Sequence, residues 1–240
     1  MMVAIFVPLA IVAALIFLAV LFVQRGRDGV DLAPHTLFRS YLYIGSLAGV
    51  VVLVFGLAAL LNAGLAFAAG NELVYGGNTG PVPPRPCPAG VGDCLQVPTP
   101  LEILAQQNAE LDRRRAEDTV RGITFSAFGG VFWLVHWLAR NRTGAGDQGA
   151  LWRSYVLIAT AMFGIATVVL LPLGLQQALT NLLVPRTAGS FRPGVGDTLT
   201  AGVVSLATWL LYLRLAAAGL RGGGERHEIV APSAPPPERG

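Results

Sequence analysis

Residues 37–65 read LFRSYLYIGSLAGVVVLVFGLAALLNAGL. After Arg39 this stretch carries no charge, and it exceeds the roughly 20 apolar residues that a helix needs to cross a membrane. Residues 151–179 repeat it, at a shift of 114 residues, as LWRSYVLIATAMFGIATVVLLPLGLQQAL. The identical positions are Leu37/Leu151, Arg39/Arg153, Ser40/Ser154, Tyr41/Tyr155, Ile44/Ile158, Val54/Val168, Leu57/Leu171, Leu61/Leu175 and Leu65/Leu179. The sequence therefore predicts a membrane protein that contains an internal repeat.

The composition also indicates a membrane protein. Of the 240 residues, 53% are apolar and 13% are charged, whereas soluble domains carry about 25% charged residues. We predict an all-α bundle of five transmembrane helices. The apolar stretches that form them are residues 3–23, 41–69, 120–139, 154–183 and 198–218. The first has no basic start, so we expect an uncleaved helix within residues 1–24 and not a cleavable signal peptide.

The second half of the repeat is fainter. At a shift of 76 residues, Thr124/Thr200, Trp133/Trp209 and Leu134/Leu210 coincide. Each repeat is then a pair of helices, the first within residues 37–142 and the second within 149–220. Two helices return the chain to the same side of the membrane, so the repeats are expected to be parallel. This predicts a four-helix core with the first helix packed outside it.

Arginines predict the orientation, because cytoplasmic loops are enriched in basic residues. The first loop, the third loop and the tail contain Arg25, Arg27, Arg39, Arg140, Arg142, Arg153, Arg221, Arg226 and Arg239. We therefore expect a cytoplasmic C-terminus and an N-terminus outside. Arg113, Arg114 and Arg115 conflict with this orientation, since they fall in the second loop, but long loops carry less weight in the rule.

The second loop divides into two parts. Residues 70–98 are rich in Gly and Pro, which predicts no regular helix, and contain Cys87 and Cys94. A cysteine pair in an extracytoplasmic loop predicts a disulfide, with unpaired thiols and metal binding as alternatives. Residues 99–119 predict a helix that continues into the third span, because Thr99, Pro100 and Glu102 form a start signal. The tail, residues 221–240, is expected to be disordered.

His136 is the ionisable side chain that lies well inside a predicted span, which makes it a candidate functional residue. Trp133 and Trp137 flank it and, with Trp209, are typical of the membrane interface. We interpret His136 as an interfacial histidine that is hydrogen-bonded to a neighbour. An alternative is a haem ligand paired with His35.

Several other residues are candidates for membrane contacts or packing. Arg39, Tyr41, Tyr43, Arg153 and Tyr155 begin the two repeats. They fit topology anchors with interfacial aromatics, or donors to lipid phosphates.

Gly45 and Gly49 form a GxxxG motif that favours close helix packing.

Enzymatic chemistry has little support in the sequence. We find no Ser-His-Asp set, carboxylate pair, phosphate-binding glycine loop or metal cluster, and expect no catalytic residue, metal or cofactor. No acidic residue lies inside a predicted span, which argues against proton- or cation-coupled transport. The scattered arginines do not form the basic face that nucleic-acid binding needs.

Arg39-Ser-Tyr41-Leu-Tyr43, followed by Trp133-Leu-Val-His136-Trp137, resembles the bacterial membrane family called domain of unknown function 5671. The resemblance covers residues 37–218 without the inserted loop, and implies tandem helix pairs in a bacterial inner membrane. The second copy departs from the pattern, because Leu157 replaces the second tyrosine and Tyr212-Leu213 replace His-Trp. The family carries no established activity, so the resemblance implies an architecture and no mechanism.

Three functions remain as hypotheses. The first is a non-enzymatic structural or accessory subunit that contacts lipids and other membrane proteins or copies of itself. The second is a small-molecule or lipid transporter acting as a homo-oligomer, which a polar cavity lined by Asn62, Gln176, Gln177 and Asn181 would support. The third is a haem protein or enzyme that uses His136.

Overall fold

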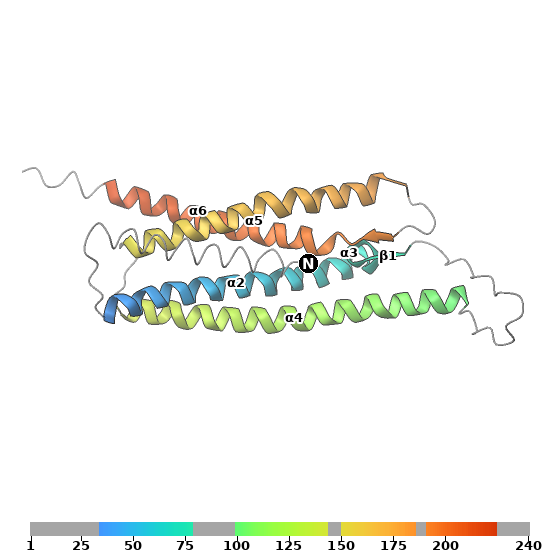
Figure 1. The fold of residues 1–240 in the computed structure, drawn as a ribbon, viewed down its shortest axis with the longest axis horizontal. Helices are drawn as coiled ribbons and strands as arrows, with labels where there is room; N and C mark the ends of the chain where they lie inside the picture. Colours follow the sequence, from blue (N-terminus) through green and yellow to red (C-terminus); the bar gives the residue numbers. More distant parts are fainter. Residues whose placement is uncertain (1–33, 79–98, 144–149, 186–190, 225–240) are drawn as a thin grey trace, which may run out of the picture.

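The computed structural model describes residues 34–78, 99–143, 150–185 and 191–224. Four long helices form a bundle in this part of the chain (Figure 1). They are α2 (Pro34–Ala69), α4 (Pro100–Arg142), α5 (Ala150–Leu183) and α6 (Gly196–Gly224). Each is long and apolar enough to cross a membrane. The all-α fold and its last four spans are therefore confirmed, while the predicted first helix lies outside the described residues.

The start of α4 follows from its sequence. The Thr99 hydroxyl accepts a hydrogen bond from the Glu102 backbone N–H at 3.3 Å, and the Glu102 carboxylate accepts one from the Thr99 backbone N–H at 2.7 Å. This capping box satisfies two backbone donors that a helix start otherwise leaves open. The helix continues from Pro100 through the third span to Arg142, which confirms the predicted extension.

The helices pair as two hairpins. Helix α2 packs mainly against α4, α5 packs mainly against α6, and α2 also contacts α6, which joins the hairpins. In Figure 1, α2 and α5 begin at the left, where α4 and α6 end. The starts of α2 and α5 therefore share one end of the bundle with the ends of α4 and α6.

Glycines allow α2 and α4 to pack backbone against backbone. A Cβ at Gly49 would lie 2.8 Å from the Trp133 backbone nitrogen, closer than real side-chain atoms approach. A Cβ at Gly129 would overlap the backbone nitrogen of Leu53 on the facing helix. Small residues permit such close approach between membrane helices. Thus Gly49 on α2 and Gly129 on α4 both permit the close packing of this hairpin.

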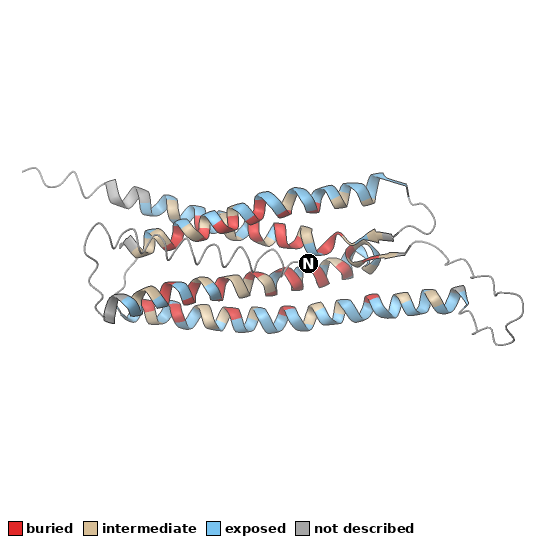
Figure 2. Cartoon of the chain, in the orientation of Figure 1, coloured by how far each residue is buried: buried red, intermediate tan, exposed pale blue. Residues whose placement is uncertain are grey.

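The core lies between the hairpins. One buried cluster consists of Tyr43, Val50, Val54, Tyr155, Val156, Ala159, Met162, Phe163 and Tyr212, and a smaller one of Ala58, Ala166, Leu170 and Ala201. Figure 2 shows α4 mostly exposed, with buried residues along one side. In the most apolar stretch of each helix, 17% of the α4 residues are buried, whereas 44% of the α2 residues are buried. Helix α4 is therefore the outer helix of its hairpin.

The structure corrects two sequence predictions. The Gly-rich start of the second loop forms a short helix, α3 (Asn71–Tyr75), followed by β1 (Gly76–Asn78). Strand β1 pairs antiparallel with β2 (Phe191–Pro193), with Gly77 opposite Arg192. Local Gly and Pro content could not reveal this, because the partner strand lies over 100 residues away. Helix α6 also extends to Gly224, so the first four residues of the predicted tail are helical.

The parallel repeat remains a prediction, but two contacts support it. Tyr41 lies next to His136 in the first hairpin, and Tyr155 lies next to Tyr212 in the second. The shift from Tyr41 to Tyr155 is 114 residues, and that from His136 to Tyr212 is 76. These are the two shifts of the predicted repeat, so the positions that it pairs make an interhelical contact in each hairpin.

Candidate functional site

Polar side chains gather at both ends of the core. The aromatic end consists of Tyr43, His136, Arg140, Trp152, Tyr155 and Tyr212. The acidic end consists of Asn62, Tyr75, Asp118 and Asp197.

At the aromatic end, Arg140 is a buried cation with an exposed fraction of 4%. Its guanidinium carbon lies 4.7 Å from the ring centre of Trp152, 5.1 Å from that of Tyr43 and 5.9 Å from that of Tyr155. Aromatic faces carry negative potential and attract a desolvated cation. This arrangement stabilises the charge of Arg140 between the two hairpins.

His136 is buried one turn before Arg140. Its Nδ1 lies 2.8 Å from the Phe132 carbonyl oxygen, and its Nε2 lies 3.4 Å from the Tyr41 hydroxyl. A Cβ at Gly45 would overlap the imidazole ring, so glycine at this position makes room for the histidine. Both ring nitrogens face protein oxygens, which fits a hydrogen-bonded structural histidine better than a haem ligand.

The tyrosines of the two repeats differ in location. Tyr41 is 55% exposed, as an interfacial residue would be. Tyr43 and Tyr155 are buried, so they cannot contact lipid phosphates as the sequence suggested. The Tyr155 hydroxyl lies 2.6 Å from that of Tyr212 and 3.4 Å from the Ser46 hydroxyl. Tyr43 and Tyr155 are therefore part of the buried core.

At the acidic end, Asn62 holds two aspartates together. The Asn62 Nδ2 donates to Asp118 Oδ2 at 2.7 Å and to Asp197 Oδ1 at 3.1 Å. Asn62 is 1% exposed, and its Oδ1 has no hydrogen-bond partner. Three helices meet here, because the three residues come from α2, α4 and α6.

The loops fix this geometry. The β1–β2 pair connects the chain after α2 to the chain before α6, and the Val195 N–H also donates to the Leu73 carbonyl at 3.1 Å. A Cβ at Gly196 would overlap Asn62 Oδ1. Only a residue without a side chain lets α6 start so close to the Asn62 amide.

Tyr75 completes the acidic end. Its hydroxyl is buried beside the Asp118 carboxylate. Burial, and then the negative charge of Asp118, raises the pKa of the Tyr75 phenol above its ordinary value. The hydroxyl therefore keeps its proton at physiological pH.

The arginine triplet is neutralised within α4. Arg113 pairs with Glu117 at 2.9 Å, Arg114 with Glu110 at 3.1 Å and Arg115 with Asp112 at 3.4 Å. These pairs join residues three or four positions apart, which share one helix face. The segment that conflicts with the predicted orientation thus carries matched charges.

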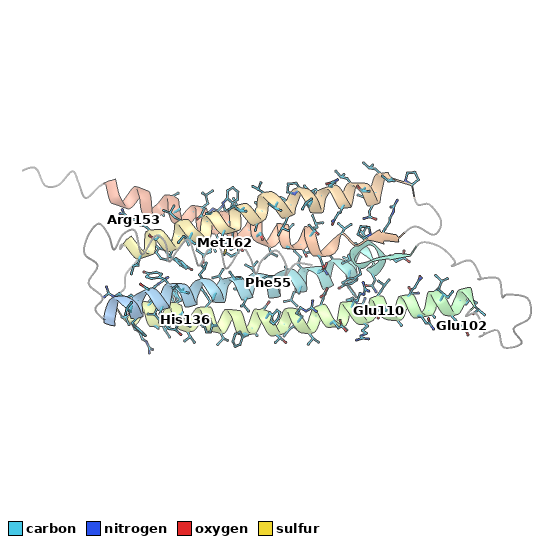
Figure 3. The ribbon with its side chains drawn as sticks, in the orientation of Figure 1. Phe55, Glu102, Glu110, His136, Arg153 and Met162 are labelled. Atoms are coloured by element: carbon cyan, nitrogen blue, oxygen red, sulfur yellow. The ribbon has the colours of Figure 1, made fainter. Side chains whose placement is uncertain are left out.

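The remaining candidates do not form a site. Trp133 stacks on Trp137 at 6.2 Å between ring centres, and Trp209 lies against Gly164. Arg153 is exposed near the aromatic end, on the same side as His136 in Figure 3. Arg39 lies in the first turns of α2 at that end. The predicted disulfide, Cys87 with Cys94, lies outside the described residues.

The proposed polar cavity of Asn62 with three residues of α5 does not form. Gln176 is exposed, and the Asn181 amide donates to the Gln177 carbonyl of its own helix. Asn62 instead faces Asp118 and Asp197, which sequence reasoning missed. Their positions in the sequence could have indicated this contact. Each aspartate directly precedes a predicted span, at the end of the bundle where the helix of Asn62 ends.

The described residues contain no group of three or more His, Cys, Asp or Glu side chains that could hold a metal ion. The acidic end has carboxylates and a protonated phenol, so its chemistry is that of hydrogen-bond acceptors for a cationic group. No family model matches the sequence, and neither a curated protein nor a solved structure is similar to it.

Proposed function

We propose that this membrane protein is a non-enzymatic accessory subunit, which a partner protein engages through the N-terminal part of α4. The supporting observation is that α4 has 43 residues, about twice the number needed to cross a membrane. Figure 1 shows its first turns extending past the other described helices. Figure 3 places Glu102 on this extension, and Glu110 level with the ends of the neighbouring helices.

The extension has a surface suited to a partner. Leu101 and Leu104 are 78% and 53% exposed and lie on one face at a spacing of three residues. Leu111, seven residues after Leu104, lies on the same face and is buried in the bundle. These three leucines form one apolar face of α4. The bundle covers this face at Leu111 and leaves it exposed at Leu101 and Leu104, where a partner can bind.

We place the protein in a bacterial inner membrane, as the resemblance to domain of unknown function 5671 implies, with the aromatic end cytoplasmic. The support is that Arg39, Arg142, Arg153 and Arg214 all lie toward that end of the bundle, and basic residues favour the cytoplasmic side. The α4 triplet lies toward the opposite end and opposes this orientation, but basic residues in a long loop carry less weight.

The test is affinity purification from native membranes in mild detergent, followed by mass spectrometry. We expect a stoichiometric partner that the double variant Leu101→Glu/Leu104→Glu loses. The matched control, Gln106→Glu/Asn108→Glu, adds the same two charges at exposed polar positions and should keep the partner. Equal recovery of the partner with both variants would rule out the tip of α4 as its contact.

A second candidate is a homo-oligomeric transporter for a small molecule or a lipid. The cavity at the acidic end favours it, because transporters need polar groups that face a ligand inside or beside the membrane. Asn62 binds Asp118 and Asp197 and does not line a cavity with the amide side chains of α5, which counts against the transport cavity expected from the sequence. Uptake of a labelled ligand into vesicles containing the purified protein would distinguish transport from simple binding.

A further inference from the structure

The acidic end contains a cavity of about 230 Å³. Its polar lining consists of Tyr75, Arg114, Glu117, Asp118, Arg121 and Asp197. It is separate from Leu101 and Leu104 at the tip of α4, and its residues come from three different elements.

The charges in this cavity do not balance. Glu117 pairs with Arg113, Arg114 with Glu110, and Arg121 with Asp118 at 3.4 Å. Asp197 has no cationic side chain within ion-pair distance among the described residues, and the group that binds it is the neutral amide of Asn62. Asp197 therefore offers an anionic position for a positively charged group.

The acceptors at this position match a primary ammonium group. Both carboxylates approach the single nitrogen of Asn62, so the bound oxygens of Asp118 and Asp197 lie close together. Asn62 Oδ1 is buried without a partner, and the Tyr75 hydroxyl is buried beside Asp118 with acceptor lone pairs to spare. An –NH₃⁺ group has three donors and no acceptor, so two carboxylates and a phenol oxygen can satisfy it completely.

A metal ion fits less well. Oxygen-bound Ca²⁺ takes about six to eight ligands, and the described residues contain no group of three potential metal-binding side chains. The cavity is also larger than the roughly 30 Å³ that one water molecule occupies in the liquid. Its size and acceptors favour an organic cation over a bare ion.

Two further features point to a phosphate next to the ammonium group. Arg114 and Arg121 line the same cavity and are half-exposed, and arginine binds phosphate through several donors at once. A neighbouring apolar depression includes Ala116 and Val120 and shares Glu117 and Arg121 with the cavity. Polar cavity and apolar depression thus adjoin where the charged part of α4 meets its membrane-spanning part.

We propose that the acidic end binds a phosphoethanolamine group, with the ammonium at Asp118, Asp197 and Tyr75 and the phosphate at Arg114 and Arg121. The headgroup of an ethanolamine phospholipid supplies this chemistry, and its acyl chains would then lie along α4 beside Val120. Free phosphoethanolamine supplies the same polar groups without the chains.

The test uses the purified full-length chain in nanodiscs that contain equal parts of ethanolamine, choline and glycerol phospholipids. Native mass spectrometry then identifies the lipids that stay bound after the nanodisc is removed. We expect about a tenfold preference for the ethanolamine lipid over the choline lipid, because a quaternary ammonium has no N–H to donate to the carboxylates. Equal retention of the choline lipid would overturn the proposal.

Variants locate the site. Asp197→Asn removes the unbalanced charge but keeps an oxygen for the Asn62 amide, and should abolish the preference. Glu102→Gln is the matched control, because it also removes one negative charge, at the start of α4 and outside the cavity lining, and glutamine can still complete the capping box. Tyr75→Phe, which keeps the ring, should reduce the preference and serves if Asp197→Asn does not fold. A preference that survives both site variants would refute the site.

Two competitors separate the sources of the ligand. Displacement of the lipid by free phosphoethanolamine at an equal concentration would uphold the chemistry and identify a soluble ligand. Displacement by Ca²⁺, lost in Asp197→Asn, would overturn the proposal in favour of a metal site.

Discussion

The two ends of the bundle place their charged side chains in opposite surroundings. At the aromatic end, a single cation, Arg140, lies between the rings of Tyr43, Trp152 and Tyr155. At the acidic end, two anions, Asp118 and Asp197, converge on the neutral amide of Asn62. The first arrangement stabilises its charge within the protein. The second leaves one negative charge without a cationic partner in the described part of the chain.

This difference indicates different tasks. A cation enclosed by aromatic faces is satisfied where it is, and its three rings come from α2 and α5, so it connects the hairpins. A pair of carboxylates around one amide still has unused lone pairs and lies beside a cavity. We therefore assign packing to the aromatic end and ligand binding to the acidic end.

Replacing Arg140 should produce the largest loss of stability. Arg140→Lys keeps the charge but loses the planar guanidinium that stacks on rings. We expect the free energy of unfolding to fall by about 2 kcal/mol or more, the value of a desolvated cation–π contact. Unfolding in mixed detergent micelles, followed by circular dichroism, measures it. Arg142→Lys, on the exposed last turn of the same helix, is the control; an equal loss there would remove the special role of Arg140.

Replacing Asn62 should have the next largest effect. Asn62→Leu fills the same space but leaves Asp118 and Asp197 without their shared donor, which costs about 1–3 kcal/mol. The predicted repeat offers a matched control, Gln176→Leu, because Gln176 is the position that it pairs with Asn62 and is exposed. The same unfolding assay should find Gln176→Leu unchanged within about 0.5 kcal/mol, as is usual for surface substitutions. Equal stability of both variants would show that the amide is not needed to hold the two aspartates.

The long apolar runs predicted the helices because each must satisfy its backbone hydrogen bonds internally within a membrane. The start of α4 was equally accessible, since Thr99 and Glu102 act within one helical turn. These features depend on residues that are close in sequence or on a simple count of apolar positions.

The acidic end could not be predicted in the same way. Asn62 and Asp118 are 56 positions apart, and Asn62 and Asp197 are 135 apart. Their meeting depends on the depth at which α2, α4 and α6 pack and on the β1–β2 pair, which no local pattern marks. Tyr43 and Tyr155 were misplaced for a related reason. An aromatic residue at the start of a span suits the interface, but the facing hairpin covers these two.

The smallest expected effects compare the two hairpins at equivalent positions. The buried hydroxyls of Tyr155 and Tyr212 are 2.6 Å apart, so Tyr212→Phe should cost about 1 kcal/mol, the net value of a typical hydrogen bond. Tyr41 is half-exposed and lies 3.4 Å from His136, so Tyr41→Phe should cost less than about 0.5 kcal/mol. The same unfolding assay can rank them. Equal losses of stability would mean that the two contacts contribute alike, as the predicted repeat implies. A larger loss for Tyr212→Phe would mean that packing between the hairpins makes the Tyr155–Tyr212 contact structural, whereas the Tyr41–His136 contact stays at the surface.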